Sequence, residues 1–148
     1  MTRELPTSLL MFIASRAAGD RIFRAVHEAG FDDVTIAQSR LMTGIDTEGT
    51  RLSVLAERAQ IAKQTATALV DKLERAGYVQ RVPDPSDGRA RLVRMTPRAE
   101  AALPTVRAEE DRIEAEWRAH LGAERMNQLR EALTALREIT DPYLLGSQ

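Results

Sequence analysis

The segment from Arg51 to Thr96 places the tightest limits on what this chain of 148 residues can fold into. Its first part carries two short apolar patterns at helical spacing, separated by a brief turn. Its second part carries two runs of β-compatible residues around a turn rich in proline and charge. This order predicts a helix-turn-helix followed by a β-hairpin wing, a unit that can place one helix and one hairpin against duplex DNA.

The two helices of this segment are predicted from their apolar spacing and their terminal residues. The first is expected from Val54 to Gln60, with Ser53 as the N-cap residue. After a turn over residues 60–63, the second is expected from about Lys63 to Ala76, and Gly77 ends it. Its buried face is predicted to hold Ala66, Leu69, Val70 and Leu73.

The opposite face of the second helix is polar and exposed in this prediction. Steps of about 100° per residue place on it or at its flanks Lys63, Gln64, Thr65, Thr67, Ala68, Asp71, Lys72 and Arg75. Glutamine can pair with adenine, threonine can meet phosphate or a thymine methyl group, and lysine can meet phosphate or guanine. The pattern fits a helix that reads the major groove, and taken alone it fits a solvated helix face equally well.

The predicted hairpin distinguishes between these two interpretations. Residues 78–82 and 92–95 are expected to form its strands, with a turn over residues 83–91. Two prolines stiffen the approach to the turn, and Asp87-Gly88 is expected to supply permissive backbone dihedrals.

The tip of the hairpin is basic. Arg89 and Arg91 alternate with Ala90, so both arginines can project from one face. An arginine held there can enter a narrow minor groove, where the potential is most negative. We expect Asp87 to pair with a nearby arginine or to brace the turn, because an unpaired acid beside phosphate would repel it.

The charge of the chain is distributed unevenly. The net charge is −1, yet residues 51–98 hold ten Lys/Arg against five Asp/Glu, while the remainder holds eleven against seventeen. A basic centre between acidic flanks can present a positive face to phosphate while the whole chain stays near neutrality. A chance fluctuation on a charged surface would give the same numbers, so charge alone does not settle the matter.

Helices are predicted on the N-terminal side of this segment. Residues 5–29 carry apolar residues at steps of three and four, and Gly30 stands where a helix C-terminal glycine belongs. His27 near that end is interpreted as structural rather than as a metal ligand. A second, short helix begins at Thr35, which forms a capping box with Gln38.

Two long helices are predicted on the C-terminal side. Thr96 and Pro97 open the first, which runs to Gly122 and should bend at Pro104. The second runs from Ala123 to Pro142. Their apolar stripes are too long for a domain of this size to cover, so we expect them to pack against a second copy of the chain; a self-contained helical cap is the alternative.

Several classes of function are excluded or disfavoured. The chain has no cysteine, so disulfides, thiolate metal sites and thiol redox switches are impossible. No glycine-rich phosphate loop, nucleophile motif or ligand cluster is present, so we expect neither an enzyme nor a metal or cofactor. No apolar run approaches the roughly 18 residues that span a bilayer, and we expect a soluble, cytoplasmic protein.

Residues 30–42, 51–81 and 84–100 resemble the multiple antibiotic resistance regulator (MarR) family. The most specific part is the wing pattern of Asp87, Arg89 and Thr96. The resemblance implies one mainly α domain over residues 1–148 with a small β-hairpin wing, in which residues 35–96 bind DNA and residues 5–30 and 97–145 dimerise. It also implies a homodimeric transcription regulator, usually a repressor, that a small aromatic or phenolic compound releases from double-stranded DNA.

The residue pattern and the family resemblance together suggest which residues bind DNA and which bind a ligand. The expected DNA contacts are Lys63, Gln64, Thr65, Thr67, Lys72, Arg89 and Arg91, with Asp87 and Gly88 supporting the wing. Candidate ligand-pocket residues are Met11, Phe12, Arg16 and Trp117, which suit a core or an interface equally. Ala62 and Ala68 depart from the family pattern and put the base contacts in doubt. A winged helix that binds protein instead of DNA is the alternative function.

Overall fold

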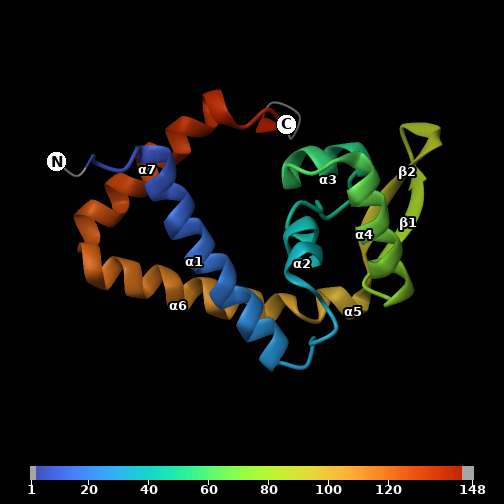
Figure 1. The fold of residues 1–148 in the computed structure, drawn as a ribbon, viewed down its shortest axis with the longest axis horizontal. Helices are drawn as coiled ribbons and strands as arrows, with labels where there is room; N and C mark the ends of the chain where they lie inside the picture. The colour runs from blue at the N-terminus through green and yellow to red at the C-terminus, as the bar shows by residue number, and fades with distance from the viewer. Residues whose placement is uncertain (1–2, 145–148) are drawn as a thin grey trace. The chain divides into compact units, whose positions relative to one another are not determined.

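The computed structural model describes residues 3–144 of the chain (Figure 1). Within them, the order of elements is α1 (Thr7–Glu28), α2 (Ile36–Met42), α3 (Leu52–Ala59), α4 (Lys63–Arg75), β1 (Val79–Asp84), β2 (Asp87–Met95), α5 (Pro97–Glu100), α6 (Leu103–Leu121) and α7 (Ala123–Thr140). The predicted fold class, mainly α with a small β-hairpin, is confirmed. By its internal contacts the chain divides into two compact units, residues 1–109 and 110–148.

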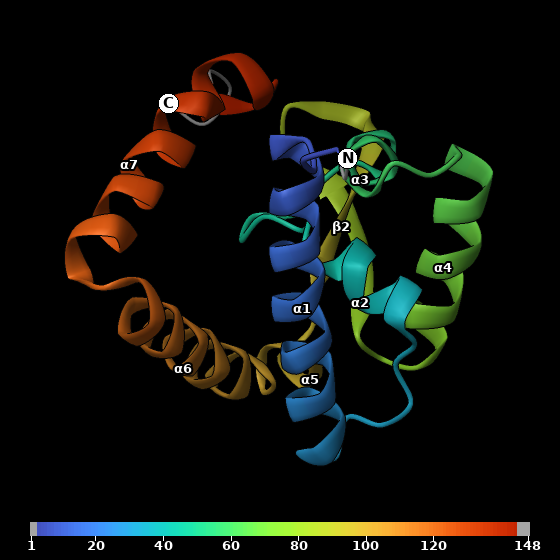
Figure 2. The same ribbon diagram turned by 60° about the vertical axis from the view of Figure 1, so that its left-hand side comes forward.

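The core of the first unit lies where α2, α3 and α4 meet the hairpin (Figure 2). The apolar face of α4 is the centre of it, because Ala66, Val70 and Leu73 are completely buried. Leu69 is half-buried and packs at the edge of the same cluster. The helical spacing therefore identified the buried face of α4 correctly, with Leu69 less covered than expected. This packing fixes which side of α4 remains exposed.

Local signals at three helix ends are confirmed. The amide of Gln38 donates to the Thr35 hydroxyl at 3.2 Å, and the Thr35 amide donates to the Gln38 side chain at 2.9 Å, which completes the capping box. Gly77, directly after the C-cap of α4, has a φ of +82°. Thr96 caps α5 by accepting a hydrogen bond from the amide of Ala99, with Pro97 as the first helical residue.

The predicted start of α3 is wrong. Ser53 lies inside the first turn, and the N-cap residue is Arg51, whose side chain makes no cap hydrogen bond. The reason is a tertiary contact, because Thr50 forms an isolated antiparallel bridge with Val93 of β2. Its amide donates to the Val93 carbonyl at 2.9 Å and its carbonyl accepts from the Val93 amide at 2.8 Å. The chain is held extended up to this point, and the helix begins immediately after it.

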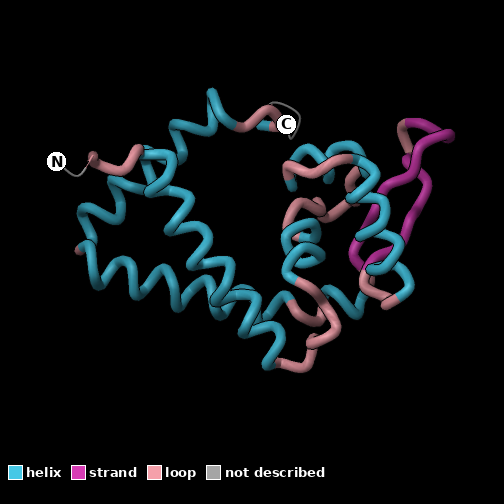
Figure 3. The backbone as a smooth tube through the Cα atoms, in the orientation of Figure 1, coloured by secondary structure: helices cyan, strands magenta, loops and turns pink. Residues whose placement is uncertain are grey.

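The turn of the hairpin also differs from the prediction. The strands extend to Asp84 and resume at Asp87, so the turn falls at Pro85-Ser86 and not at Asp87-Gly88 (Figure 3). Gly88 is not among the glycines with a positive φ. A side chain closes the turn instead, since Asp84 accepts hydrogen bonds from the Ser86 amide at 2.8 Å and the Ser86 hydroxyl at 2.7 Å.

The register of the strands leaves a bulge beside this turn. Val82 pairs with Leu92 and Pro83 with Arg91, but Asp84 pairs with Asp87. Residues 88–90 therefore have no partner on β1. A bulge of this kind bends the strand and re-aims its side chains, here next to the tip of the hairpin.

Pro104 does not bend a long helix as predicted. A turn at residues 101–102, in which Ala101 keeps helical dihedrals, separates the four-residue α5 from the start of α6 at Leu103. Pro104 thus occupies the first turn of α6, where its missing N–H would have no intrahelical partner. The proline marks a helix start, which the sequence pattern did not distinguish from a kink.

The unit of residues 110–148 consists of the greater part of α6 and of α7, joined at Gly122. Arg130 of α7 pairs with Glu114 of α6 at 2.9 Å, and Arg118 of α6 donates to the side chain of Asn127 at 3.0 Å. These contacts tie the two helices together within the unit. Among the helices of residues 3–144, none combines the length and apolar character needed to cross a membrane.

Candidate nucleic-acid interface

The exposed N-terminal half of α4 carries most of the residues predicted to read DNA. Lys63, Gln64 and Thr65 are exposed in its first turn, and Lys72 is exposed farther along. Thr67 is half-buried, and its hydroxyl donates to the Lys63 carbonyl at 2.9 Å. While that bond persists, Thr67 offers a partner only a methyl group and an acceptor oxygen.

The start of α4 lacks a side-chain cap. Ala62 is the N-cap residue, in an extended conformation, and no side chain accepts a hydrogen bond there. The first amides of a helix have no intrahelical acceptors and lie at the positive end of the helix dipole. An anion such as phosphate would be stabilised at this end of α4.

The acidic residues of α4 are engaged by the hairpin. Arg81 of β1 pairs with Asp71 at 2.8 Å and with Glu74 at 2.9 Å, and its own amide donates to Glu74 at 3.2 Å. These contacts fix the orientation of α4 relative to β1. They also offset the negative charges on the outward side of the helix.

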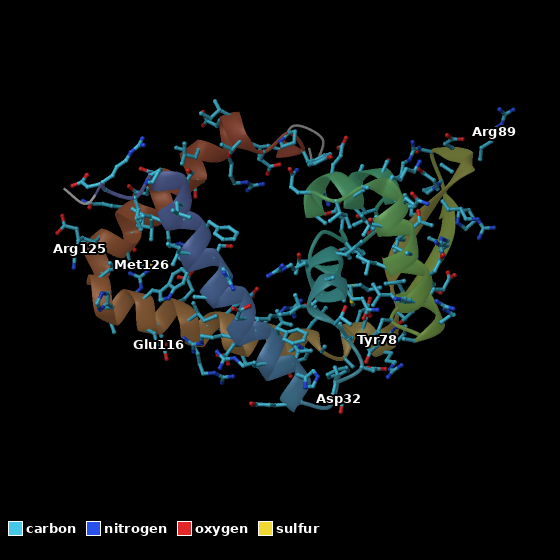
Figure 4. All side chains as sticks on the ribbon, in the orientation of Figure 1. Asp32, Tyr78, Arg89, Glu116, Arg125 and Met126 are labelled. Carbon is cyan, nitrogen blue, oxygen red and sulfur yellow. The ribbon has the colours of Figure 1, made fainter. Side chains whose placement is uncertain are left out.

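Arg89 projects from the tip of the hairpin, away from the rest of the lobe (Figure 4). It lies in the bulge, and its amide donates to the Asp87 carboxylate at 3.0 Å. Arg91 lies opposite Pro83 and is also exposed. Asp87 thus braces the backbone at Arg89, whereas Gly88 contributes no special backbone conformation.

A buried carboxylate in the wing was missed by the sequence reasoning. Asp84 is only 6% exposed and pairs with Arg51, at the start of α3, at 2.8 Å. Hydrogen bonds from Ser86, followed by the one from Arg51, lower the pKa of Asp84 to about 2. The spacing of Asp84 and Ser86 is a turn signal that could have identified this aspartate. Nothing local could have identified Arg51, which is distant in sequence.

These ion pairs leave the exposed face of the lobe basic. Each acid of α4 and of the wing has an arginine partner: Asp71, Glu74, Asp84 and Asp87. Six cations of the same elements have no ion-pair partner within the described part of the chain: Lys63, Lys72, Arg75, Arg89, Arg91 and Arg94. Arg75 and Arg94 were not among the predicted contacts, although charge alone could have suggested them. The arrangement supplies positive charge on α4 and the hairpin together.

A cluster of Tyr78, Asp33 and Arg98 holds together three segments of the first unit: the loop before α2, the end of α4 and the start of α5. The buried Tyr78, between α4 and β1 (Figure 4), donates its hydroxyl to Asp33 in the loop before α2. Arg98 of α5 pairs with Asp33 at 3.0 Å, lies 4.3 Å from the centre of the Tyr78 ring and donates to the carbonyl of Ala76. Burial, and then the bond to Asp33, raise the pKa of Tyr78 to about 12. The cluster holds the exit of α4 against α5.

The first unit also contains a hollow of about 730 Å³ lined by residues of α1, α2 and α3. Of the candidate ligand-pocket residues, Phe12 and Arg16 line it and Met11 does not. Trp117 lies on α6 in the other compact unit. Arg40 and Arg58 bring two further guanidinium groups to the wall. An aromatic side chain with several arginines suits a flat, anionic molecule.

Comparisons with known proteins agree with this geometry. A family model described as MarR family matches residues 32–90. No curated protein sequence matches the chain.

Solved structures with the same fold include three regulators. Transcriptional regulator PA4135 is 24% identical, with a TM-score of 0.67, over 92% of this chain and 99% of that one. Transcriptional regulator Tm0710 from Thermotoga maritima is 24% identical, with a TM-score of 0.60, over 93% and 96%. Wild-type MarR from E. coli in its apo form is 20% identical, with a TM-score of 0.70, over 90% and 98%. At these identities the likeness establishes the fold.

The Asp84 site predicts a specific acid dependence of stability. Because folding lowers its pKa from 3.8 to about 2, the stability that the ionised Asp84 contributes is complete above about pH 4 and is lost as the pH falls towards 2. Urea unfolding between pH 7 and pH 2 should show the free energies of the wild type and Asp84→Asn converging over this window. Ser86→Ala removes the largest cause of the pKa shift but keeps the carboxylate. In this variant the pH range over which stability is lost should be narrower. A difference that stays constant down to pH 2 would contradict the assignment.

Proposed function

We propose that this chain, whose residues 32–90 match a MarR family model, is a cytoplasmic transcription regulator of that family, which binds a pseudo-palindromic DNA site as a homodimer. Residues 35–96 form the DNA-binding lobe in this proposal, and residues 5–30 and 97–145 form the dimer. The protein acts as a repressor, and a small aromatic or phenolic ligand releases it from the operator.

The observation that carries the proposal is the distribution of paired and unpaired charges on the lobe. The acids of α4 and the wing are paired with arginines of the same lobe, while six cations on these two elements have no such partner among the described residues. Phosphates of duplex DNA are the partner that matches a helix and a hairpin with this charge. A winged helix that binds protein needs no such separation.

The proposed docking follows from the positions of these side chains. Gln64 offers donor and acceptor groups for adenine in the major groove, while Lys63 and Lys72 neutralise flanking phosphates. Thr65 contributes its free hydroxyl, and Thr67 contributes its methyl group. Ala68, at the centre of the outward face, cannot form a hydrogen bond with a base, so specificity depends more on DNA shape than on many direct contacts.

The wing completes the proposed complex. Arg89 at the tip enters the adjacent minor groove, where its charge meets the strongest negative potential. Arg91 and Arg94 follow on β2 and meet the phosphate backbone. Because wing and helix contact different grooves, the lobe is fixed on the duplex in one orientation.

Exposed apolar side chains support the homodimer. On α1, large apolar side chains are exposed at Leu9, Leu10, Met11, Phe12 and Ile13, and on α7 at Leu129, Leu133 and Ile139. A monomer rarely leaves this many large apolar side chains of two helices exposed to water. A second copy of the chain would cover it, and a two-fold axis would place two reading helices about one DNA turn apart.

The hollow at α1, α2 and α3 supports ligand-dependent release. It joins a helix of the proposed dimer to two helices of the DNA-binding lobe. A ligand that binds one spacing of these elements better than another shifts the population toward that spacing. Coupling to DNA follows, because the distance between the two reading helices changes with it.

Arg89→Ala should weaken binding to duplex DNA by about 1–3 kcal/mol, since one arginine contact in the minor groove is lost. Fluorescence anisotropy with a labelled operator fragment at physiological salt measures the change. Arg3→Ala, at an exposed arginine outside both the lobe and the proposed dimer segments, is the matched control and should have little effect. Equal affinity of Arg89→Ala and the wild type would remove the wing from the interface.

Leu10→Glu should convert the dimer to a monomer. Leu10 is 53% exposed within one chain, so the substitution should leave the fold of a chain intact, whereas a carboxylate buried in an interface costs several kcal/mol. Sedimentation velocity at micromolar concentration distinguishes the two states. Thr47→Glu, at an exposed position after α2 and outside the proposed dimer segments, serves as the control for added charge. A wild type that sediments as a monomer would refute the dimer.

A further inference from the structure

Arg51 links the start of α3 to the tip of the wing. Its Nε lies 2.9 Å from Oδ2 of Asp84, and its Nη2 lies 2.8 Å from the same oxygen. The same Nη2 is 3.8 Å from Oδ2 of Asp87. One guanidinium group therefore faces two carboxylates on either side of the turn, one buried and one exposed.

Both carboxylates in turn hold the backbone of the tip. The second oxygen of Asp84 accepts the two hydrogen bonds from Ser86 that close the turn. The second oxygen of Asp87 accepts the hydrogen bond from the Arg89 amide. A continuous series of polar contacts therefore runs from α3 through the wing acids to the backbone of Arg89.

The base of this series is fixed by backbone contacts. Thr50, directly before Arg51, pairs with Val93 of β2 through two hydrogen bonds. Gly49 packs so closely on β2 that a Cβ at this position would lie 2.9 Å from the Cβ of Leu92. The Arg51 backbone thus has a defined position relative to the strand that carries Arg89.

The bulge at residues 88–90 depends on such side-chain contacts. Its residues have no register partners on β1, because the pairing passes directly from Arg91 to Asp87. Without another restraint, this part of the wing would sample several conformations, and ordering it on DNA would reduce the affinity.

We propose that Arg51 is a positioning residue for DNA binding, which holds the wing tip in place so that Arg89 is presented to the minor groove. This proposal rests on the proposed function and adds to it a residue outside α4 and the hairpin.

The first test reports on the wing tip without DNA. The chain has no cysteine, so Gly88→Cys provides a single site for a nitroxide label. A Cβ at this glycine meets nothing within 4 Å, and its φ is not positive, so the label should be tolerated. The spin-label spectrum should show greater mobility when Arg51→Ala is added. Arg51→Lys, which keeps the charge and a donor, should restore part of the order.

Arg58→Ala is the matched control for this measurement. Arg58 lies on the same helix and pairs with Asp46 at 3.1 Å, away from the wing. Its loss should leave the label spectrum unchanged. A thermal unfolding curve of each variant shows whether any change in mobility is confined to the wing.

The second test is a double-mutant cycle on DNA affinity in the unlabelled protein. Arg51→Ala should reduce affinity roughly three- to tenfold in the wild-type background and hardly at all in the Arg89→Ala background, because it acts through Arg89. The measurement uses the full chain and one duplex fragment at constant salt, since phosphate contacts depend on salt.

Three results would overturn the proposal. The first is an unchanged label spectrum in Arg51→Ala. The second is an equal loss of affinity from Arg51→Ala with and without Arg89, which would mean that Arg51 contacts DNA directly. The third is a spectrum that changes just as much in Arg58→Ala. If the wild type binds no DNA, the proposed function fails, while the label spectrum still decides whether Arg51 holds the wing.

Discussion

The pairing of the lobe's acids with its own arginines is the interaction on which the rest of this structure depends. Arg81 engages Asp71 and Glu74, and Arg51 engages Asp84 and Asp87. The partly exposed pairs of Arg81 contribute little to the free energy of unfolding, whereas the buried Asp84 contributes a pH-dependent part of it. The main effect of these pairs is geometric and electrostatic, because they orient α4 and the wing tip and leave the remaining positive charge of both elements facing outward.

Packing and charge act on opposite sides of the same helix. The buried face of α4 sets its rotation, and Arg81 then fixes its direction relative to β1. At its exit, the contacts of Arg98 with Tyr78 and with the Ala76 carbonyl connect it to α5. A change in the position of α5 would therefore reach α4 through packed and hydrogen-bonded groups, as the proposed ligand-dependent release requires.

Sequence reasoning succeeded where the cause of a structure is local. The capping box of Thr35 and Gln38 and the buried face of α4 need only short-range spacing, and both are present. It failed where a tertiary contact decides. The start of α3 follows from the bridge between Thr50 and Val93. The wing turn was misplaced for a different reason, because the local signal of Asp84 and Ser86 was overlooked in favour of Asp87-Gly88. The role of Arg51 depends on a partner 33 positions away, which no local pattern encodes.

The salt dependence of binding to any duplex DNA tests the central claim most directly, because phosphate contacts do not require the operator sequence. Each phosphate neutralised contributes about −0.9 to the slope of log K against log salt concentration. Six cations on α4 and β2 of each copy have no ion-pair partner among the described residues, which makes twelve in the dimer. The account predicts a slope of about −11 if all of them meet phosphates, and of about −5 or steeper if half of them do. A slope near zero, or no binding at low salt, would contradict it.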